Sequence, residues 1–270
     1  MRTCSFFMPW LACVLIWSQS SLCGMSTVPV VGTKNMVVTA QHEATDVGLE
    51  ILRHGGNAVD AAVAIGYALA VTYPSCGNLG GGGFMTIHCV NGKDTFINFR
   101  EKAPLRARRD MYLDANGNVI PGLSTVGYLA VAVPGTPAGL EYALQRYGTL
   151  SRAAVIGPAI GLAINGFVLG QGDVDLLYPP IDSFRTQPNV SNIFLKGGKP
   201  YQVGDRLLQP ELGRTLILLA LFGPMAFYQG PIADKIADAS STNGGILSKR
   251  GLFELFRRRI DAAAKSVSRV

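Results

Sequence analysis

Charged residues are scarce in this sequence, and histidine and cysteine are scarcer still. Asp, Glu, Lys and Arg make up 16% of the 270 residues, hydrophobic residues make up 48%, and there are only three histidines and five cysteines. This balance excludes an intrinsically disordered chain, which needs high charge and few apolar residues. The three histidines, His42, His54 and His88, are scattered, and no group of residues has zinc-ligand spacing. We therefore expect no metal site.

Few cysteines remain once the N-terminal segment is set aside. Cys4, Cys13 and Cys23 lie in the first 23 residues, which leaves Cys76 and Cys89 in the body of the chain. This pair flanks a glycine-rich segment, and its spacing alone leaves a disulfide open. We expect two buried thiols instead.

Net positive charge is almost absent from the body of the chain, although the whole chain carries a net charge of +6. Residues 249–270 hold seven basic and two acidic residues and so account for most of that charge. The nearly neutral remainder gives no reason to expect a nucleic-acid partner. The sequence predicts a basic tail over 249–270, set apart from a domain over 24–248.

No apolar run is long enough to cross a membrane comfortably, because a helical span needs about 20 apolar residues. The N-terminus instead resembles an export signal: Arg2 precedes an apolar stretch over 6–17, and small residues follow over 18–23. We predict a signal peptide over 1–23 and a periplasmic or secreted protein with no stable span after its removal. An uncleaved anchor is the alternative.

The sequence predicts a core helix of small, apolar residues, preceded by clear helix stop and start signals. A first helix ends at Gly55-Gly56, and Asn57 can cap the next one, over 58–70, which is apolar on all sides. A helix of this length and composition belongs in the core. Further helices are expected over 136–147, 151–164, 225–239 and from Pro210. With no internal repeat, one α/β domain is the economical prediction.

Glycines gather immediately after that core helix. Residues 80–83 are four consecutive glycines, and two apolar runs joined by Asn91-Gly92 follow, the pattern of a β-hairpin. Four glycines mean that the backbone approaches something closely or adopts positive φ. A phosphate-binding loop lies between a strand and a helix, whereas here a helix precedes the glycines and a strand follows. This order argues against a nucleotide site.

An arginine stands where the second strand of the hairpin should end. Arg100 can be an ordinary surface residue paired with Glu101. It can also be a fork-shaped donor that holds a substrate carboxylate through two hydrogen bonds, with Glu101 orienting the guanidinium. The residue pattern alone leaves both interpretations open.

Several segments together resemble the large-subunit half of the γ-glutamyltranspeptidases (glutathione hydrolases). Their order and spacing over about 36–245 make the resemblance specific. The segments are His54-Gly55-Gly56-Asn57-Ala58-Val59-Asp60, Gly77-Asn78-Leu79-Gly80-Gly81-Gly82-Gly83-Phe84, Phe99-Arg100-Glu101-Lys102-Ala103-Pro104, Val133-Pro134-Gly135-Thr136-Pro137, Asn165-Gly166-Phe167 and Phe227-Tyr228-Gln229-Gly230.

The resemblance implies part of an N-terminal-nucleophile (Ntn) hydrolase, an α/β (α+β) fold in which an αββα sandwich is incomplete here. It implies an acyltransferase that transfers or hydrolyses the γ-glutamyl group of compounds such as glutathione. A threonine at the start of a small subunit would attack the γ-glutamyl amide, with its own α-amine as base. Arg100 would hold the glutamyl α-carboxylate. Neither a metal nor an organic cofactor is implied, and a small subunit is the implied partner.

The chain also departs from that family. No threonine is followed by Thr-His, so no catalytic residue is assigned. From Arg250 onward the sequence departs from the family pattern, which suggests a truncated gene with a frameshifted or recombined end. A basic amphipathic helix that binds a membrane or nucleic acid is the alternative for this tail. The alternative for function is an inactive fragment that retains weak glutamyl-carboxylate binding through Arg100.

Overall fold

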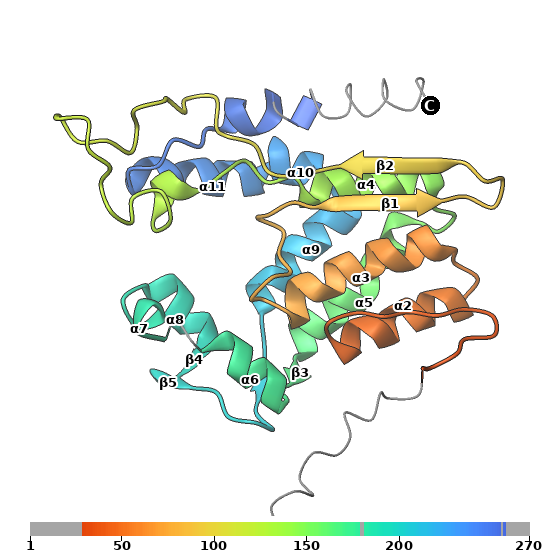
Figure 1. Cartoon of the computed structure of the whole chain (residues 1–270). Coiled ribbons are helices and arrows are strands. Elements are labelled where there is room, and N and C mark those ends of the chain that lie inside the picture. The colour runs from red at the N-terminus through yellow and green to blue at the C-terminus, as the bar shows by residue number, and fades with distance from the viewer. Residues whose placement is uncertain (1–28, 179–180, 255, 258–270) are drawn as a thin grey trace, which may run out of the picture. The chain divides into compact units, whose positions relative to one another are not determined.

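A computed structural model describes residues 29–178, 181–254, 256 and 257 (Figure 1). The chain divides into two units, Met1–Met36 and Val37–Val270. The described residues of the first unit, 29–36, contain no helix or strand and are mostly exposed. The predicted signal peptide over 1–23 lies outside the described residues. Everything that follows concerns the second unit.

Two capped helices begin this unit. In α2 (His42–Arg53) the Gln41 side chain accepts from the Glu43 amide at the start, and the helix stops before Gly55, whose φ is +88°. In α3 (Ala58–Thr72) Asn57 and Asp60 form a reciprocal capping box. Most of α3 is buried, as its apolar composition predicts. It contacts α2, α4 and α5 and so forms the centre of the core.

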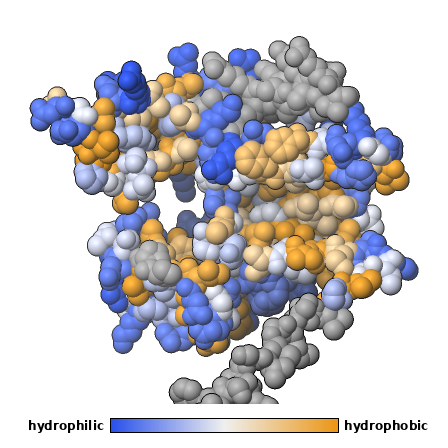
Figure 2. All heavy atoms as spheres, viewed as in Figure 1, coloured by the Kyte–Doolittle hydropathy of each residue, from blue (hydrophilic) through white to orange (hydrophobic). Residues whose placement is uncertain are grey.

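The predicted hairpin is present. β1 (Phe84–His88) pairs antiparallel with β2 (Asp94–Asn98), in a register from Phe84 opposite Asn98 to His88 opposite Asp94. Gly92 takes a positive φ of 79° in the turn. The side chains alternate, so that Ile97 is buried toward α4 while Phe84 and Phe96 stack on the open face. Figure 2 shows hydrophobic residues on this side of the molecule.

Four longer helices complete the core together with one short one. These are α4 (Thr136–Tyr147), α5 (Arg152–Asn165), α9 (Pro210–Phe222), α10 (Met225–Tyr228) and α11 (Pro231–Thr242). Among them, α5 packs against α3 and α9, and α10 packs against α9 and α11. The expected helix over 225–239 is thus two helices with a break before Pro231, which cannot donate a backbone hydrogen bond.

Short elements fill the remaining sequence. They are η1 (Tyr128–Ala130), β3 (Phe167–Val168), α6 (Gln171–Leu177), α7 (Ile181–Arg185), α8 (Pro188–Phe194), β4 (Leu195–Lys196), β5 (Lys199–Pro200) and β6 (Arg206–Leu207). β3 pairs with β6, and β4 pairs with β5, both antiparallel. Within the described ranges every sheet has two strands.

The domain boundary predicted after Ser248 does not mark the end of the packed core, because residues beyond it are also buried. Residues 249–254, 256 and 257 are helical, and Leu252 and Phe256 are buried. The Phe256 ring stacks on Tyr228, with 4.6 Å between ring centroids. The start of the basic tail is therefore part of the core, because its apolar residues occur at a helical spacing of four.

The helices of the described residues are short compared with a membrane crossing. No single helix there combines the length and the apolar character that a crossing requires. The segments Pro210–Phe222 and Met225–Thr242 pass the test of length and composition only as a pair, and they are bent by 119°.

Candidate functional site

Arg100 lies two residues beyond β2. Its amide donates to Asn98 Oδ1 at 3.1 Å, which turns the chain out of the strand. Its Nε lies 3.4 Å from Glu101 Oε2, so the two predicted site residues are adjacent and paired. The Arg100 side chain is 64% exposed and that of Glu101 26%. An exposed pair of this kind contributes about 0.2–1 kcal/mol, so the guanidinium can engage a ligand at little cost to stability.

The glycine run makes close approaches instead of adopting positive φ. None of residues 80–83 is among the glycines with positive φ. A Cβ on Gly82 would lie 2.5 Å from the carbonyl oxygen of Phe99 and 2.9 Å from the carbonyl carbon of Arg100. The neighbouring Gly83 carbonyl accepts from the Phe99 amide at 2.9 Å. The run therefore lies against the backbone that carries Arg100.

Phe99 anchors this backbone in the core. The residue is buried, and a Cβ on Gly139 of α4 would collide with its ring. A Cβ on Gly83 would meet the same ring at 3.0 Å. The absence of side chains at Gly83 and Gly139 thus lets the Phe99 ring pack directly against α4.

A second set of backbone hydrogen bonds holds the segment after Arg100 and the glycine run against the chain that leads into α4. Lys102 and Val133 form a bridge, with N–O distances of 3.2 and 2.8 Å. The Gly81 carbonyl accepts from the amides of Gly135 and Thr136, at 2.7 and 3.0 Å. These two amides stand at the start of α4, where helical N–H groups lack partners in the helix itself. The strand end, the glycine run and α4 therefore form one connected unit.

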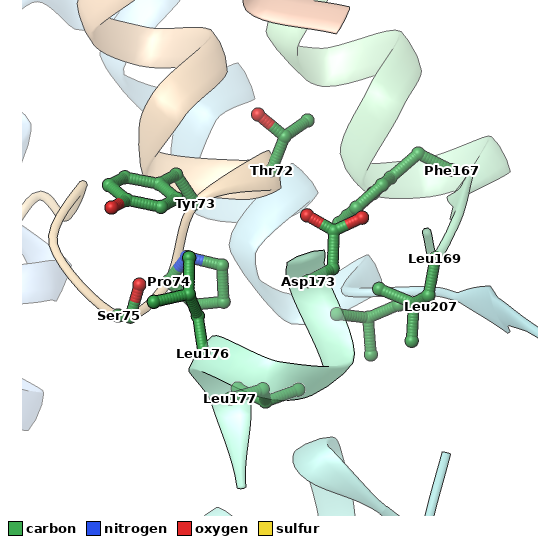
Figure 3. Close-up of a pocket in the computed structure, with 10 residues that line it drawn as sticks. All are labelled: Thr72, Tyr73, Pro74, Ser75, Phe167, Leu169, Asp173, Leu176, Leu177 and Leu207. Carbon is green, nitrogen blue, oxygen red and sulfur yellow. The ribbon is translucent and has the colours of Figure 1, made fainter. Parts of the chain in front are cut away.

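A small cavity lies elsewhere and contains none of the predicted site residues. Its volume is about 10 Å³, room for about one water molecule, so it cannot hold a γ-glutamyl compound. Figure 3 shows its ten lining residues: Thr72, Tyr73, Pro74, Ser75, Phe167, Leu169, Asp173, Leu176, Leu177 and Leu207. The Asp173 carboxylate accepts from Gln41 Nε2 and the Gly170 amide, both at 2.8 Å. The structural role of Asp173 is therefore to link the start of α6 to the residue that caps α2.

A larger open hollow, which sequence reasoning missed, follows the Arg100 motif. Its volume is about 550 Å³, within the range of small-molecule sites. Arg106 and Arg108 give it a positive lining, and apolar side chains complete it: Leu105, Ala107, Met111, Leu129 and Ile246. The cluster of arginines just after Pro104 is the sequence signal that could have identified it.

The two body cysteines are separate. Cys76 is exposed, Cys89 is half-buried, and both are free thiols. The expectation of two buried thiols is therefore wrong: the turn that follows α3 leaves the Cys76 side chain in solvent, and Cys89 is only half-buried.

Comparisons with known proteins give a single consistent result. A sequence model of the family described as gamma-glutamyltranspeptidase matches residues 44–263. A glutathione hydrolase proenzyme of Pseudomonas sp. (strain A14) is 50% identical over 261 residues, 96% of this chain and 45% of that protein. The Escherichia coli (strain K12) glutathione hydrolase proenzyme is 46% identical over 83% of this chain and 39% of its own length. This chain thus spans less than half the length of these relatives.

Solved structures agree with the sequence relatives. The Helicobacter pylori gamma-glutamyltranspeptidase structure matches with a TM-score of 0.81 and 44% identity, over 83% of this chain and 65% of that one. A gamma-glutamyltranspeptidase of Pseudomonas nitroreducens complexed with L-DON matches with a TM-score of 0.77 and 40% identity, over 82% and 65%. The expected fold class, a mixed α/β chain covering part of an Ntn hydrolase, is confirmed. The family match also continues past Ser248.

Proposed function

Because the chain belongs to the gamma-glutamyltranspeptidase family, we propose that it supplies the substrate-carboxylate part of an active site for γ-glutamyl compounds such as glutathione. One observation carries the proposal. Within the family-matched region, Arg100 stands at the end of β2 with most of its guanidinium open to solvent, on a backbone held from two sides.

Arg100 would bind the α-carboxylate of the glutamyl group. Its Nε faces Glu101, which leaves the two terminal nitrogens to form parallel hydrogen bonds to a carboxylate. A clamp that is buried can be worth 2–5 kcal/mol or more when one partner is deleted. At 64% exposure we expect less, about 1–2 kcal/mol, and therefore weak binding that rises when further groups enclose the ligand.

The bond-breaking step needs a nucleophile that these 270 residues do not offer in the expected context, since no threonine is followed by Thr-His. We propose that the threonine and its α-amine base come from a small-subunit part like the portion of the relatives that this chain does not match. The hydroxyl would attack the γ-amide carbon while the α-amine takes its proton, and the C–N bond of the amide would break as that proton passes to the departing amine of the substrate. Water or an acceptor amine would then take the acyl group and free the threonine hydroxyl.

An assay with and without that missing part tests the proposal. The chain is incubated with a chromogenic γ-glutamyl anilide, alone and after co-expression with the unmatched C-terminal part of the Pseudomonas sp. A14 relative. We expect no release by the chain alone, release by the combination, and its loss in Arg100→Ala. Arg214→Ala is the control, because Arg214 is similarly exposed and also paired with an acid, Glu211. Release by the chain alone would refute the missing nucleophile.

The same assay decides the second candidate, a catalytically inactive chain that only binds glutamyl carboxylates. The chain's coverage of less than half of its relatives favours this alternative for the polypeptide on its own. L-glutamine, which carries the α-carboxylate and a γ-amide, is a suitable binding probe. Retained Arg100-dependent binding without turnover in any combination would establish the second function in place of the first.

We also propose export, on the strength of Arg2 and the apolar stretch over 6–17. Expression in a Gram-negative host followed by N-terminal sequencing of the periplasmic fraction tests it. A mature N-terminus near residue 24 is expected, and retention of the intact chain in the cytoplasm would refute export.

A further inference from the structure

We infer that Gly82 is a positioning residue for Arg100, because only the absence of a side chain at this place lets the Arg100 backbone take its position. The inference deepens the proposed function and rests on it for the role of Arg100. It concerns one glycine of the run over 80–83, and the structure separates that glycine from its neighbours.

The contacts of Gly82 are with backbone atoms. A Cβ there would lie 2.5 Å from the Phe99 carbonyl oxygen, 2.7 Å from the Glu101 amide nitrogen and 2.9 Å from the Arg100 carbonyl carbon. Ordinary van der Waals contact begins at 3.4 Å. Backbone atoms cannot rotate away as a side chain can, so a methyl group at Gly82 must displace the segment by about 1 Å.

The displacement would be concentrated at Arg100. On one side the Phe99 ring is fixed against α4 at Gly139, and on the other Lys102 is bridged to Val133. Between these anchors the residues free to shift are Arg100 and Glu101, the two residues of the predicted clamp. A misplacement of about 1 Å can cost a positioned group a hundredfold in catalysis. For a binding contact this exposed, we expect about tenfold.

The same glycine run contains a matched control. A Cβ on Gly80 would meet only Asn78 Oδ1, at 4.0 Å, and φ is not positive there. At Gly81 the Cβ would meet the Asn78 side chain, which can move aside. An added methyl group would therefore have free space at Gly80 and would meet the movable Asn78 side chain at Gly81. Only at Gly82 would it collide with the backbone around Arg100.

The experiment compares Gly82→Ala with Gly80→Ala in the full chain. NMR spectra without ligand record the Arg100 Nε–H signal and the amides of Phe99 and Glu101, and a titration with L-glutamine gives Kd. We expect Gly82→Ala to shift those signals and to raise Kd about tenfold, and Gly80→Ala to leave both within error. A role confined to stability would lower the melting temperature and leave the signals and Kd of the folded protein unchanged.

Each outcome decides a different point. Unchanged Arg100 signals and Kd in folded Gly82→Ala would overturn the inference. Shifted signals in a chain whose wild type does not bind L-glutamine would leave the positioning intact and refute the proposed function. If Gly82→Ala does not fold by circular dichroism, the wild type decides: its Arg100 and Glu101 amides must show backbone order equal to that of Ile97 in β2. Higher mobility at Arg100 and Glu101 would overturn the inference.

Discussion

Replacing Asp60 with alanine should destabilise the junction between α3 and the α4–α5 connection. The Asp60 carboxylate is fully buried and accepts hydrogen bonds from four donor groups. The donors are the Asn57 amide at 2.8 Å, the Thr149 amide at 2.9 Å, the Thr149 hydroxyl at 2.7 Å and the Leu150 amide at 3.1 Å. Burial raises the pKa of this carboxyl, but the hydrogen bonds from Thr149, Asn57 and Leu150 outweigh it and hold the pKa below 3.8.

The expected loss follows from the donors that remain. Asp60→Ala leaves three amides and one hydroxyl without their charged acceptor, and a hydrogen bond to a charged group is worth about 1.5–3 kcal/mol. Breaking a buried charged network by removing one partner costs about 3–5 kcal/mol in total. For a chain of this size that lowers the unfolding temperature by about 10 °C.

Hydrogen exchange gives the local readout. At neutral pH the Thr149 and Leu150 amides should exchange about ten- to a hundredfold faster in Asp60→Ala, since each loses a bond worth at least one factor of ten. Asp46→Ala, an exposed acid on α2, is the control and should change neither quantity. Equal exchange rates and equal unfolding temperatures in wild type and Asp60→Ala would refute the reasoning.

Acid adds a further test of Asp60. Its folded pKa lies below the unfolded value of 3.8, so the ionised carboxylate stabilises the fold at all pH values well above 3.8. The contribution is lost as pH falls below 3.8 through the folded pKa. The difference in stability between wild type and Asp60→Ala should therefore be constant near neutrality and shrink only in strong acid.

Two further predictions concern a buried hydroxyl and an exposed surface. Tyr228→Phe removes the hydroxyl that donates to the Pro134 carbonyl at 2.9 Å in the core, and should lower the free energy of unfolding by about 1–3 kcal/mol in urea titrations; an unchanged midpoint would contradict this. Phe84 and Phe96 are 55% and 57% exposed, and replacing both with threonine should raise the soluble fraction after ultracentrifugation. Val119→Thr, a loop control of similar exposure, should change it less, and equal gains would argue against a role of the hairpin face.

Local signals in the sequence predicted much of the fold. Asn57 before an apolar run predicted a capped core helix, and α3 is that helix, two residues longer than expected. The Asn91-Gly92 pair predicted the hairpin, and Pro210 predicted the start of α9. Each of these elements depends on capping, turn or periodicity signals within a few residues, which a single sequence displays.

Long-range contacts could not be predicted in the same way. The run Met36-Val37-Val38-Thr39-Ala40 has the composition of a strand, but it has no strand partner among the described residues and is not a strand. The glycine run left close approach and positive φ equally open, and the contact of Gly82 with the Arg100 backbone decides between them. The basic charge of residues 249–270 predicted a separate tail. Phe256 of that segment instead packs on Tyr228, which lies well before it in the sequence.

The same distinction between local signals and long-range contacts applies to the candidate site. Arg100 and Glu101 were identifiable by motif, and the structure brings them together as expected. The residues that hold them, above all Gly82 and Gly139, were not, because a glycine's contacts are visible only once the chain is folded. Their role as a clamp for a ligand stays a prediction.

Paired titrations with L-glutamine and L-isoglutamine test the central claim most directly. The two ligands have the same composition, but L-glutamine presents a free α-carboxylate and L-isoglutamine an α-carboxamide. If Arg100 holds the α-carboxylate, the wild-type chain should prefer L-glutamine by about five- to thirtyfold, as a contact of 1–2 kcal/mol requires, and Arg100→Ala should lose the preference. Equal affinities in the wild type, or a preference that persists in Arg100→Ala, would contradict the account.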